Sequence, residues 1–321
     1  MLCKVLGCGS YLPPNIITNN ELQKEKNLNT SSEWIETRTG ILQRHISSPE
    51  ELTSDLANKA ALAAIYDAQI NKFDIDLIIV CTTTPDNTLP STAAKVQGYL
   101  ELNTVPSFDL QAVCSGFVYG LHLADSLLQT KKHKTILLIG AEKMSCLLDW
   151  TDRSSCILFG DGAGAIILST NHQSKQSGIV DTAIYSDGKL YNILYTDGGT
   201  ALNNKSGKLR MHGKEVFKHA VEKMSSSIDN LLKKNNLTQN DIKYLIPHQG
   251  NIRIIDNIAS KLNIPEKKIV KTIYKHANCS AASIPLALDY LKNNYILNEG
   301  DLILIVALGA GLTWGCALIK W

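Results

Sequence analysis

Three residues of this chain have side chains suited to nucleophilic chemistry and stand where strands are expected to end: Cys114, His248 and Asn278. Cys114 lies in FDLQAVCSGF, where a strand gives way to a helix. Its sulfur is therefore expected to face the free N–H groups and the positive dipole end of that helix, which favour the reactive thiolate. A thiol, a neutral imidazole and an amide together indicate covalent acyl chemistry.

Each of the three residues also has a plainer interpretation. A cysteine among small residues is often a compact apolar filler, a histidine after YLIP can cap a strand, and Asn278 can satisfy its own turn. The turn Gly309-Ala310-Gly311 supplies a backbone N–H for an oxyanion, and the combination favours the chemical interpretation.

Composition limits the classes of protein to consider. The 321 residues are 44% hydrophobic and 19% charged, which predicts an ordinary globular protein of two domain-sized units. No stretch approaches the roughly 20 apolar residues of a membrane span, and MLCKVLGCGSYLPPN does not resemble a signal peptide, so we expect a soluble cytoplasmic protein. Eight cysteines without a CxxC pair predict reduced thiols, and a net charge of +2 does not indicate nucleic acid as a partner.

The elements that position these residues form an internal repeat. Leu56 to Cys81 predicts an amphipathic helix, a polar loop and the buried strand DIDLIIVC, and Lys223 to His248 predicts the same series 167 positions later. His248 is then the counterpart of Cys81. Farther along, LQAVCSGFVYGLHLADSLL aligns with YKHANCSAASIPLALDYLK, which places Cys279 opposite Cys114.

Strands and helices alternate in both halves, which predicts an α/β protein with two mixed sheets and apolar helices buried between them. The expected halves are residues 1–172, which carry the cysteine nucleophile, and residues 173–321, which carry the histidine and asparagine. The boundary falls in the polar stretch NHQSKQSG.

Two other signals predict nothing specific. GDGAGA (160–165) has the glycines of a phosphate loop, but it continues into the strand-like IIL and no clear helix follows. His248 and His276 have no third ligand at metal spacing, so no metal site is expected.

Taken together, six segments of the chain resemble β-ketoacyl-acyl-carrier-protein synthase III, the family that begins type II fatty acid synthesis. They are EWIETRTGILQRH, DLQAVCSGF, DWTDRSSCILFGDGAGA, PHQGNIRI, NCSAASIP and GAGLTWG. The resemblance covers essentially the whole chain in the expected order. It implies the duplicated thiolase fold with five layers, αβαβα.

The resemblance also implies a role for each residue. Cys114 would take an acyl group, by default acetyl, from acyl-CoA, with an oxyanion hole made by the N–H groups of Cys114 and Ala310. His248 and Asn278 would then hold the enolate formed when malonyl-acyl carrier protein loses carbon dioxide. The product would be a 3-oxoacyl-acyl carrier protein, and no metal or redox cofactor would be needed.

Binding positions follow in the same way, together with a homodimer in which Leu89 bounds the partner's acyl pocket. Coenzyme A would contact Trp34, Arg38, Arg153, Gly213, Val216 and Phe217. The carrier protein would dock on Gln249, Gly250, Asn251, Ile252 and Arg253.

Three alternatives remain at this point. A relative in the same superfamily, such as a polyketide or alkylquinolone starter enzyme, would use the same triad on another acyl group. A Cys-His hydrolase would release the acyl group to water, although Asn278 is placed for an enolate and not for orienting His248. A homologue that only binds the carrier protein would not need the intact set of three.

Overall fold

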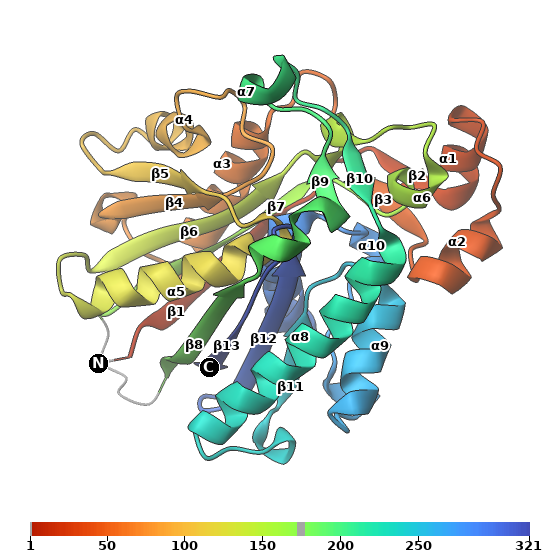
Figure 1. The fold of residues 1–321 in the computed structure, drawn as a ribbon. Helices are drawn as coiled ribbons and strands as arrows, with labels where there is room; N and C mark the ends of the chain where they lie inside the picture. Colours follow the sequence, from red (N-terminus) through yellow and green to blue (C-terminus); the bar gives the residue numbers. More distant parts are fainter. Residues whose placement is uncertain (1, 172–176) are drawn as a thin grey trace.

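The first half of the molecule is built on a five-stranded sheet in the order β1-β7-β6-β4-β5 (Figure 1). The computed structural model describes residues 2–171 and 177–321. Strand β4 runs parallel to both of its neighbours, and β7 runs antiparallel to β6 and β1. The elements of this half are β1 (Lys4–Tyr11), α3 (Thr53–Ala68), β4 (Leu77–Cys81), α4 (Thr92–Tyr99), β5 (Ser107–Leu110), α5 (Gly116–Gln129), β6 (Thr135–Glu142) and β7 (Gly162–Ser169).

The second half repeats this plan on a four-stranded sheet in the order β11-β12-β13-β8. A parallel bridge between Leu245 and Ile269 stands where the first half has its fifth strand. The elements are β8 (Gly178–Ser186), α8 (Gly213–Lys234), β11 (Tyr244–Pro247), α9 (Ile252–Lys261), α11 (Ser283–Asn294), β12 (Leu302–Gly309) and β13 (Thr313–Lys320).

The predicted duplication is confirmed, and its spacing of 167 residues extends farther than the sequence comparison placed it. Strands β4 and β11, helices α5 and α11, and strands β6 and β12 all begin 167 positions apart. The 3-10 turns η2 (Val113–Ser115) and η7 (Ser280–Ala282) keep the same spacing. The counterpart of Cys114 is therefore Ala281 and not Cys279, so the predicted pairing of Cys114 with Cys279 was two residues out of register.

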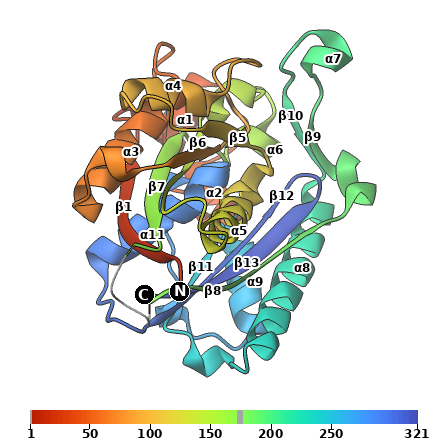
Figure 2. The same ribbon diagram turned by 90° about the vertical axis from the view of Figure 1, so that its left-hand side faces the viewer.

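The predicted five layers are also present. Helices α3 and α4 cover the outer face of the first sheet, and α8 covers that of the second with α9 beside it (Figures 1 and 2). Helices α5 and α11 lie between the sheets, where α5 contacts β6 and β13 and α11 contacts β7 and β11. Phe117, Leu121, Ile284 and Leu288 of these two helices are fully buried, as helices covered on both sides require.

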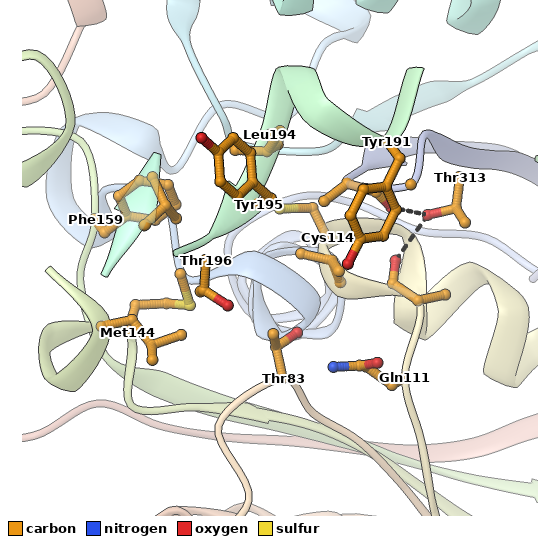
Figure 3. Close-up of a pocket in the computed structure, with 16 residues that line it drawn as sticks. Thr83, Gln111, Cys114, Met144, Phe159, Tyr191, Leu194, Tyr195, Thr196 and Thr313 are labelled. Carbon is orange, nitrogen blue, oxygen red and sulfur yellow. Dashed lines mark hydrogen bonds between the residues drawn. The ribbon is translucent and has the colours of Figure 1, made fainter. Parts of the chain in front are cut away.

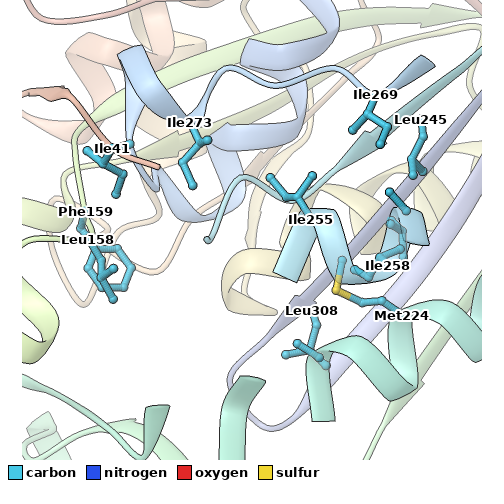
Figure 4. Packing of buried hydrophobic residues seen from close by; sticks show 14 of the residues in the cluster. Ile41, Leu158, Phe159, Met224, Leu245, Ile255, Ile258, Ile269, Ile273 and Leu308 are labelled. Atoms are coloured by element: carbon cyan, nitrogen blue, oxygen red, sulfur yellow. The ribbon is translucent and has the colours of Figure 1, made fainter. Parts of the chain in front are cut away.

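The outer layer of the second half has its own apolar core (Figure 4). Met224 of α8 and Ile255 and Ile258 of α9 pack there with Leu245 of β11 and Leu308 of β12. Because these helices are amphipathic and solvent-covered on their other side, burying this face is what holds them on the sheet. The packing fixes α9, and with it the turn that follows β11.

Short elements are inserted between these layers. The elements α1, α2, β2, β3 and α6 gather on one side of the molecule (Figure 1), where α2 contacts α9. The hairpin of β9 and β10, with α7 at its tip, projects from the body (Figure 2). Their bounds are β2 (Ile16–Thr18), α1 (Asn19–Glu25), α2 (Ser32–Thr39), β3 (Gln43–His45), α6 (Arg153–Cys156), β9 (Leu194–Thr196), α7 (Thr200–Asn203), β10 (Leu209–Met211) and α10 (Ile273–His276).

The glycines of GDGAGA have a packing role. Gly162 and Gly164 lie in β7, and a Cβ on Gly164 would stand 2.7 Å from the backbone nitrogen of Leu286 in α11. Real Cβ contacts are essentially never that short, so glycine is what lets the central helix approach the strand. From Gly162 onward the segment is a strand, which agrees with the sequence prediction that it is not a nucleotide-binding loop.

The described part of the chain contains no helix with the length and apolar character needed to cross a bilayer. The predicted boundary between the halves, at residues 172/173, lies outside the described residues. Strand β7 ends before it at Ser169, and β8 begins after it at Gly178.

Candidate active site

Cys114 occupies the middle of η2, in the tight turn between β5 and α5. Val113 before it has φ +50°, in the left-handed region, and the side chain of Cys114 is 6% exposed. Burial raises the pKa of the Cys114 thiol to about 12 despite hydrogen bonds that lower it. The predicted position at a helix start is confirmed, but the predicted thiolate is not favoured, because desolvation of the sulfur outweighs the backbone N–H groups.

The Cys114 side chain opens into a cavity of about 320 Å³ (Figure 3). Apolar side chains from several elements form much of its wall, and the hairpin β9–β10 closes one side. The lining residues are Thr83, Gln111, Ala112, Val113, Cys114, Met144, Leu147, Phe159, Tyr191, Leu194, Tyr195, Thr196, Leu209, Ala310, Gly311 and Thr313. A thioester bound at the sulfur would place its acyl chain among these groups.

Hydrogen bonds hold the Cys114 turn against the end of β12. The hydroxyl of Thr313 accepts from the Ser115 hydroxyl at 2.8 Å, and its single proton lies between two carbonyl oxygens, those of Ala112 at 3.0 Å and Ala310 at 2.9 Å. A Cβ on Gly309 would stand 2.7 Å from the Cys114 nitrogen, so only glycine allows this approach. The two turns predicted to form an oxyanion hole are therefore neighbours in space.

His248 follows the last residue of β11 and is 8% exposed. Its Nδ1 forms a 2.7 Å hydrogen bond with the hydroxyl of Ser283, the first residue of α11. Burial lowers the pKa of the imidazole to about 4. The ring is therefore neutral at pH 7, as the sequence predicted.

Asn278 lies just before η7 and is fixed on three sides. Its N–H donates to Leu158, its carbonyl accepts from Gly160, and its side-chain oxygen accepts from the Ser280 N–H at 2.8 Å. With its side-chain oxygen occupied, the amide Nδ2 is left to donate.

His248 and Asn278 converge beside Gly250. A Cβ built on Gly250 would lie 3.0 Å from His248 Nε2 and 3.7 Å from Asn278 Nδ2. Ser280 connects this pair to the nucleophile, because its N–H bonds Asn278 and its turn, η7, packs against the Cys114 turn, η2. The structure thus brings together the three side chains that the sequence singled out.

The residues expected to hold coenzyme A lie outside this centre. The guanidinium groups of Arg153 and Arg38 stand 4.8 and 5.8 Å from the centre of the half-buried Trp34 ring. Val216 and Phe217 follow Gly213 in the first turns of α8, and both are half-buried. The group combines an aromatic face with two cations, which suits a nucleotide that carries phosphates.

The turn predicted to dock the carrier protein requires one correction. Gln249 is fully buried, and its side chain bonds the carbonyls of Pro247 and Val270 and the N–H groups of Thr272 and Ile273. It therefore braces the turn and cannot contact a partner.

The other residues of this turn stand nearer the surface. Asn251 caps α9 and donates to the Arg38 carbonyl at 3.2 Å, and Ile252 packs against Gly40. Arg253 is exposed and stands 5.8 Å from the centre of the Phe217 ring. The turn is thereby linked to both parts of the predicted coenzyme site.

Three residues that contact the site were missed from the sequence: Glu142, Ser280 and Ser283. Glu142 ends the buried strand TILLIGAE, and an acidic residue in so apolar a strand was a usable signal. The two serines gave no signal, because small hydroxyl residues are common in turns and helix starts. Within residues 2–171 and 177–321 no three metal-ligating side chains are grouped as a metal site.

Comparison with known proteins agrees with this site. Two family models match: the 3-oxoacyl-[acyl-carrier-protein] synthase III model over residues 108–188, and its C-terminal model over residues 232–321. The β-ketoacyl-[acyl-carrier-protein] synthase III proteins of Rickettsia bellii and Rickettsia prowazekii are 59% and 60% identical over 321 residues, covering 100% of both chains.

Solved structures give the same result. The 3-oxoacyl-[acyl-carrier-protein] synthase III of Aquifex aeolicus is 44% identical with a TM-score of 0.94, covering 99% of this chain and 100% of the other. That of Pseudomonas aeruginosa is 37% identical with a TM-score of 0.93, covering 100% and 98%. The chain belongs to the β-ketoacyl-[acyl-carrier-protein] synthase III family, the acyltransferase-type condensing enzymes that initiate fatty acid synthesis.

Proposed function

We propose that this chain transfers an acyl group from acyl-coenzyme A to Cys114 and then joins it to the malonyl unit of malonyl-acyl carrier protein. The observation that carries the proposal is the space beside Gly250, which His248 Nε2 and Asn278 Nδ2 flank from different elements. Two neutral donors directed at one point suit an oxygen that gains negative charge, as a thioester enolate does.

In the first step the Cys114 sulfur attacks the thioester carbonyl of acyl-CoA. The carbonyl oxygen becomes an oxyanion, which accepts hydrogen bonds from the N–H groups of Cys114 and Ala310. The bond to coenzyme A then breaks and the acyl group stays on Cys114. Thr313 serves this step by holding the two turns together.

In the second step the malonyl group loses carbon dioxide and its thioester oxygen becomes an enolate. His248 can donate from Nε2 when the Ser283 hydroxyl donates to Nδ1, and Asn278 donates from Nδ2. The carbanion attacks the acyl-Cys114 carbonyl and releases the 3-oxoacyl-carrier product. This chemistry uses no metal or redox cofactor.

The surface around Trp34, Arg38 and Arg153 is the proposed seat of the nucleotide end of coenzyme A. The planar ring of Trp34 provides a stacking face, and the two guanidinium groups suit phosphate oxygens. The Arg253 guanidinium stands 5.8 Å from the centre of the Phe217 ring. The pantetheine arm would pass along Phe217, from this nucleotide surface to the cavity.

Acyl carrier protein, which is small and acidic, is the proposed second partner. A chain that acts on this partner would function in the cytoplasm. Since the whole chain carries a net charge of only +2, attraction must come from a local group of cations near the site. Arg253, Lys214, Lys218 and Lys261 are exposed on the first turns of α8 and along α9. Asn251 and Ile252 would complete the contact.

A second copy of the chain is the proposed partner at the free edge of the first sheet. Among residues 2–171 and 177–321 strand β5 pairs only with β4, and Phe108 on it is 36% exposed. Leu89 is 79% exposed and Leu202 of α7 is 72% exposed, and a hydrogen bond between Thr88 and Thr200 brings their segments together, as at a surface that another chain covers. Pairing of two β5 strands would cover this edge and allow Leu89 to reach the partner's acyl cavity.

Acetyl is the proposed primer by analogy with the family, and a larger primer is the second candidate. A cavity of about 320 Å³ exceeds what an acetyl group fills, and the chain is 31% identical, with a TM-score of 0.93, to the priming β-ketosynthase of the R1128 polyketide pathway. The relative rates with acetyl-, propionyl- and branched acyl-CoA decide between them.

The test uses Cys114→Ala with Cys146→Ser as the matched control, because Cys146 is exposed and outside the cavity wall. Wild type and the control should gain one acyl group by mass on incubation with acyl-CoA, and then form a 3-oxoacyl product from malonyl-acyl carrier protein. Cys114→Ala should do neither. Release of free acid without condensed product would instead indicate the hydrolase.

A further inference from the structure

Glu142 is a fully buried carboxyl group that the proposed mechanism does not use. It ends β6, and its Oε2 accepts hydrogen bonds from the Thr83 N–H at 3.0 Å and from the hydroxyls of Thr84 and Thr82 at 2.8 and 3.3 Å. Burial raises the pKa of the Glu142 carboxyl group, and the hydrogen bonds from these neutral donors oppose that rise. Burying a charged carboxyl group costs folding free energy unless hydrogen bonds compensate it.

The other oxygen of Glu142 faces the second half of the molecule. Oε1 accepts from the Ser280 hydroxyl at 2.9 Å and from the Ala281 N–H at 3.5 Å. The turn η7, which holds Ser280, packs against η2, which holds Cys114. Burial raises the pKa of the Cys114 thiol, and hydrogen bonding to the Ser280 side chain opposes that rise. Ser280 therefore lies between the carboxylate and the turn that carries the thiol, and its N–H on Asn278 fixes it there.

We infer that Glu142 is the proton acceptor for Cys114, acting through the Ser280 hydroxyl. As the sulfur attacks the thioester, the S–H bond breaks and that proton passes to Ser280 Oγ. The original Ser280 proton passes to Glu142 Oε1 at the same time. Ser280 ends as a hydroxyl again, Glu142 is neutral, and the negative charge has moved from the carboxylate to the sulfur.

The surroundings of Cys114 make such an acceptor necessary. Burial raises the pKa of its thiol to about 12, so the free thiolate is scarce at pH 7. Burial lowers the pKa of His248 to about 4, which makes the imidazole a weak base. Burial raises the pKa of Glu142, which makes it a better base than an exposed carboxylate. Moving one charge within the site also avoids creating a second buried charge.

The relay closes its own cycle. Coenzyme A leaves as a thiolate and takes its proton from solvent, while the proton from Cys114 stays on Glu142 in the acyl-enzyme. When the carbanion displaces Cys114, the sulfur leaves as a thiolate and recovers that proton through Ser280. One proton is consumed per turnover, on coenzyme A.

Other titratable groups around Glu142 are mostly thiols. Cys81 of β4 and Cys279 beside η7 feel its charge, and burial raises the pKa of each above its ordinary value. The pKa of Cys146, whose side chain is exposed, is raised by partial desolvation of its sulfur and by the charges of Asp161 and Glu142. Asp109 and Asp161 act on these thiols in the same direction. The neighbouring Lys143 ammonium is held by the carbonyls of Ser48, Pro49 and Glu51. Below pH 9 Cys81 and Cys279 should remain protonated and add no step to the profile of Cys114.

The experiment measures two rates from pH 6 to pH 10: alkylation of Cys114 by iodoacetamide, and single-turnover acylation by acetyl-CoA. Wild type should show a plateau through neutral pH, because thiol and carboxyl share one proton over that range. Glu142→Gln and Ser280→Ala should both be at least tenfold slower at pH 7. Both should accelerate about tenfold per pH unit, as a thiol without an internal base does.

Charge alone predicts the opposite for Glu142→Gln. The carboxylate raises the pKa of Cys114 by repulsion, so its removal without a relay would make the thiol faster. The matched control is Asp161→Asn, a second fully buried carboxyl held by Ser47 and Ser145 without a hydroxyl that bridges to Cys114. Its profile should follow wild type. If either relay variant does not fold, as judged by circular dichroism, the other provides the same test.

This inference rests on the proposed role of Cys114, and the two fail differently. If wild-type Cys114 takes no acyl group from acyl-CoA, the proposed function is wrong. If Cys114 is acylated but Glu142→Gln and Ser280→Ala keep the wild-type profile or become faster at pH 7, the relay is wrong and the condensing function stands.

Discussion

Replacing Gly250 with alanine should block the enolate site without removing either donor. The added methyl carbon would stand 3.0 Å from His248 Nε2 and 3.7 Å from Asn278 Nδ2, in the space that the enolate oxygen would occupy. Since Cys114 lies on the other side of Ser280 and lines a cavity that does not include Gly250, the first half-reaction should continue.

The magnitude follows from the geometry. A methyl at 3.0 Å from Nε2 takes the place of the acceptor, so at least one hydrogen bond to the enolate is lost. Loss of one such donor slows catalysis by about 10²–10³-fold, and loss of both would cost more. Condensation should therefore slow by at least about 100-fold, while acylation of Cys114 stays within about threefold of wild type, because its oxyanion donors are not blocked.

The assay separates the two steps. Acylation is followed by the mass of the protein after mixing with acetyl-CoA, and decarboxylation by labelled carbon dioxide from malonyl-acyl carrier protein. The matched control is Gly98→Ala in α4, where an added Cβ meets no atom within 4 Å. The control should keep both rates. Equal slowing of acylation and condensation in Gly250→Ala, or a condensation rate equal to that of the control, would refute the assignment of this space to the enolate.

Three further predictions follow from the same site. Burial lowers the pKa values of His248 and His276 to about 4, so below pH 6.5 these histidines bind protons in the unfolded chain but not in the folded protein. Their contribution to the unfolding free energy should therefore fall between pH 6.5 and 4, by about 1.4 kcal/mol per pH unit for each histidine. Urea titrations measure this change, and a rise over the same range would contradict these pKa values. Arg253→Glu should raise the KM for malonyl-acyl carrier protein several-fold and reduce the salt dependence of that KM, while the rate of acylation by acyl-CoA stays nearly unchanged. If the reactions with both substrates slow equally, the proposed docking surface is wrong. In timed iodoacetamide treatment, peptide mapping should show that Cys114 is labelled and that acyl-CoA blocks this labelling. Cys279 should stay unmodified, because it is fully buried and its thiol donates to the His276 carbonyl. Early labelling of Cys279 would contradict this burial.

The sequence alone determined the architecture of this protein and the identity of its reactive residues. Periodicity is a local property, so the helix and strand after Leu56 and their repeat after Lys223 could be recognised without knowing what they pack against. Cys114, His248 and Asn278 stand at the ends of such elements, where side chains of parallel strands meet at one edge. Their roles came from resemblance to a family and not from the pattern itself.

Tertiary structure decided the register of the repeat, the protonation of the nucleophile and the supporting residues. Ala281, and not Cys279, is the counterpart of Cys114, because the turns η2 and η7 align in space where their letters do not. Gln249 proved to be a brace, because burial depends on the four backbone groups around it. The helix start alone favoured a thiolate at Cys114, but how far that sulfur is removed from water depends on both halves of the chain. Desolvation is a sum over all surrounding elements, so a pKa near 12 and a carboxyl group reached through Ser280 could be seen only once those elements were packed together.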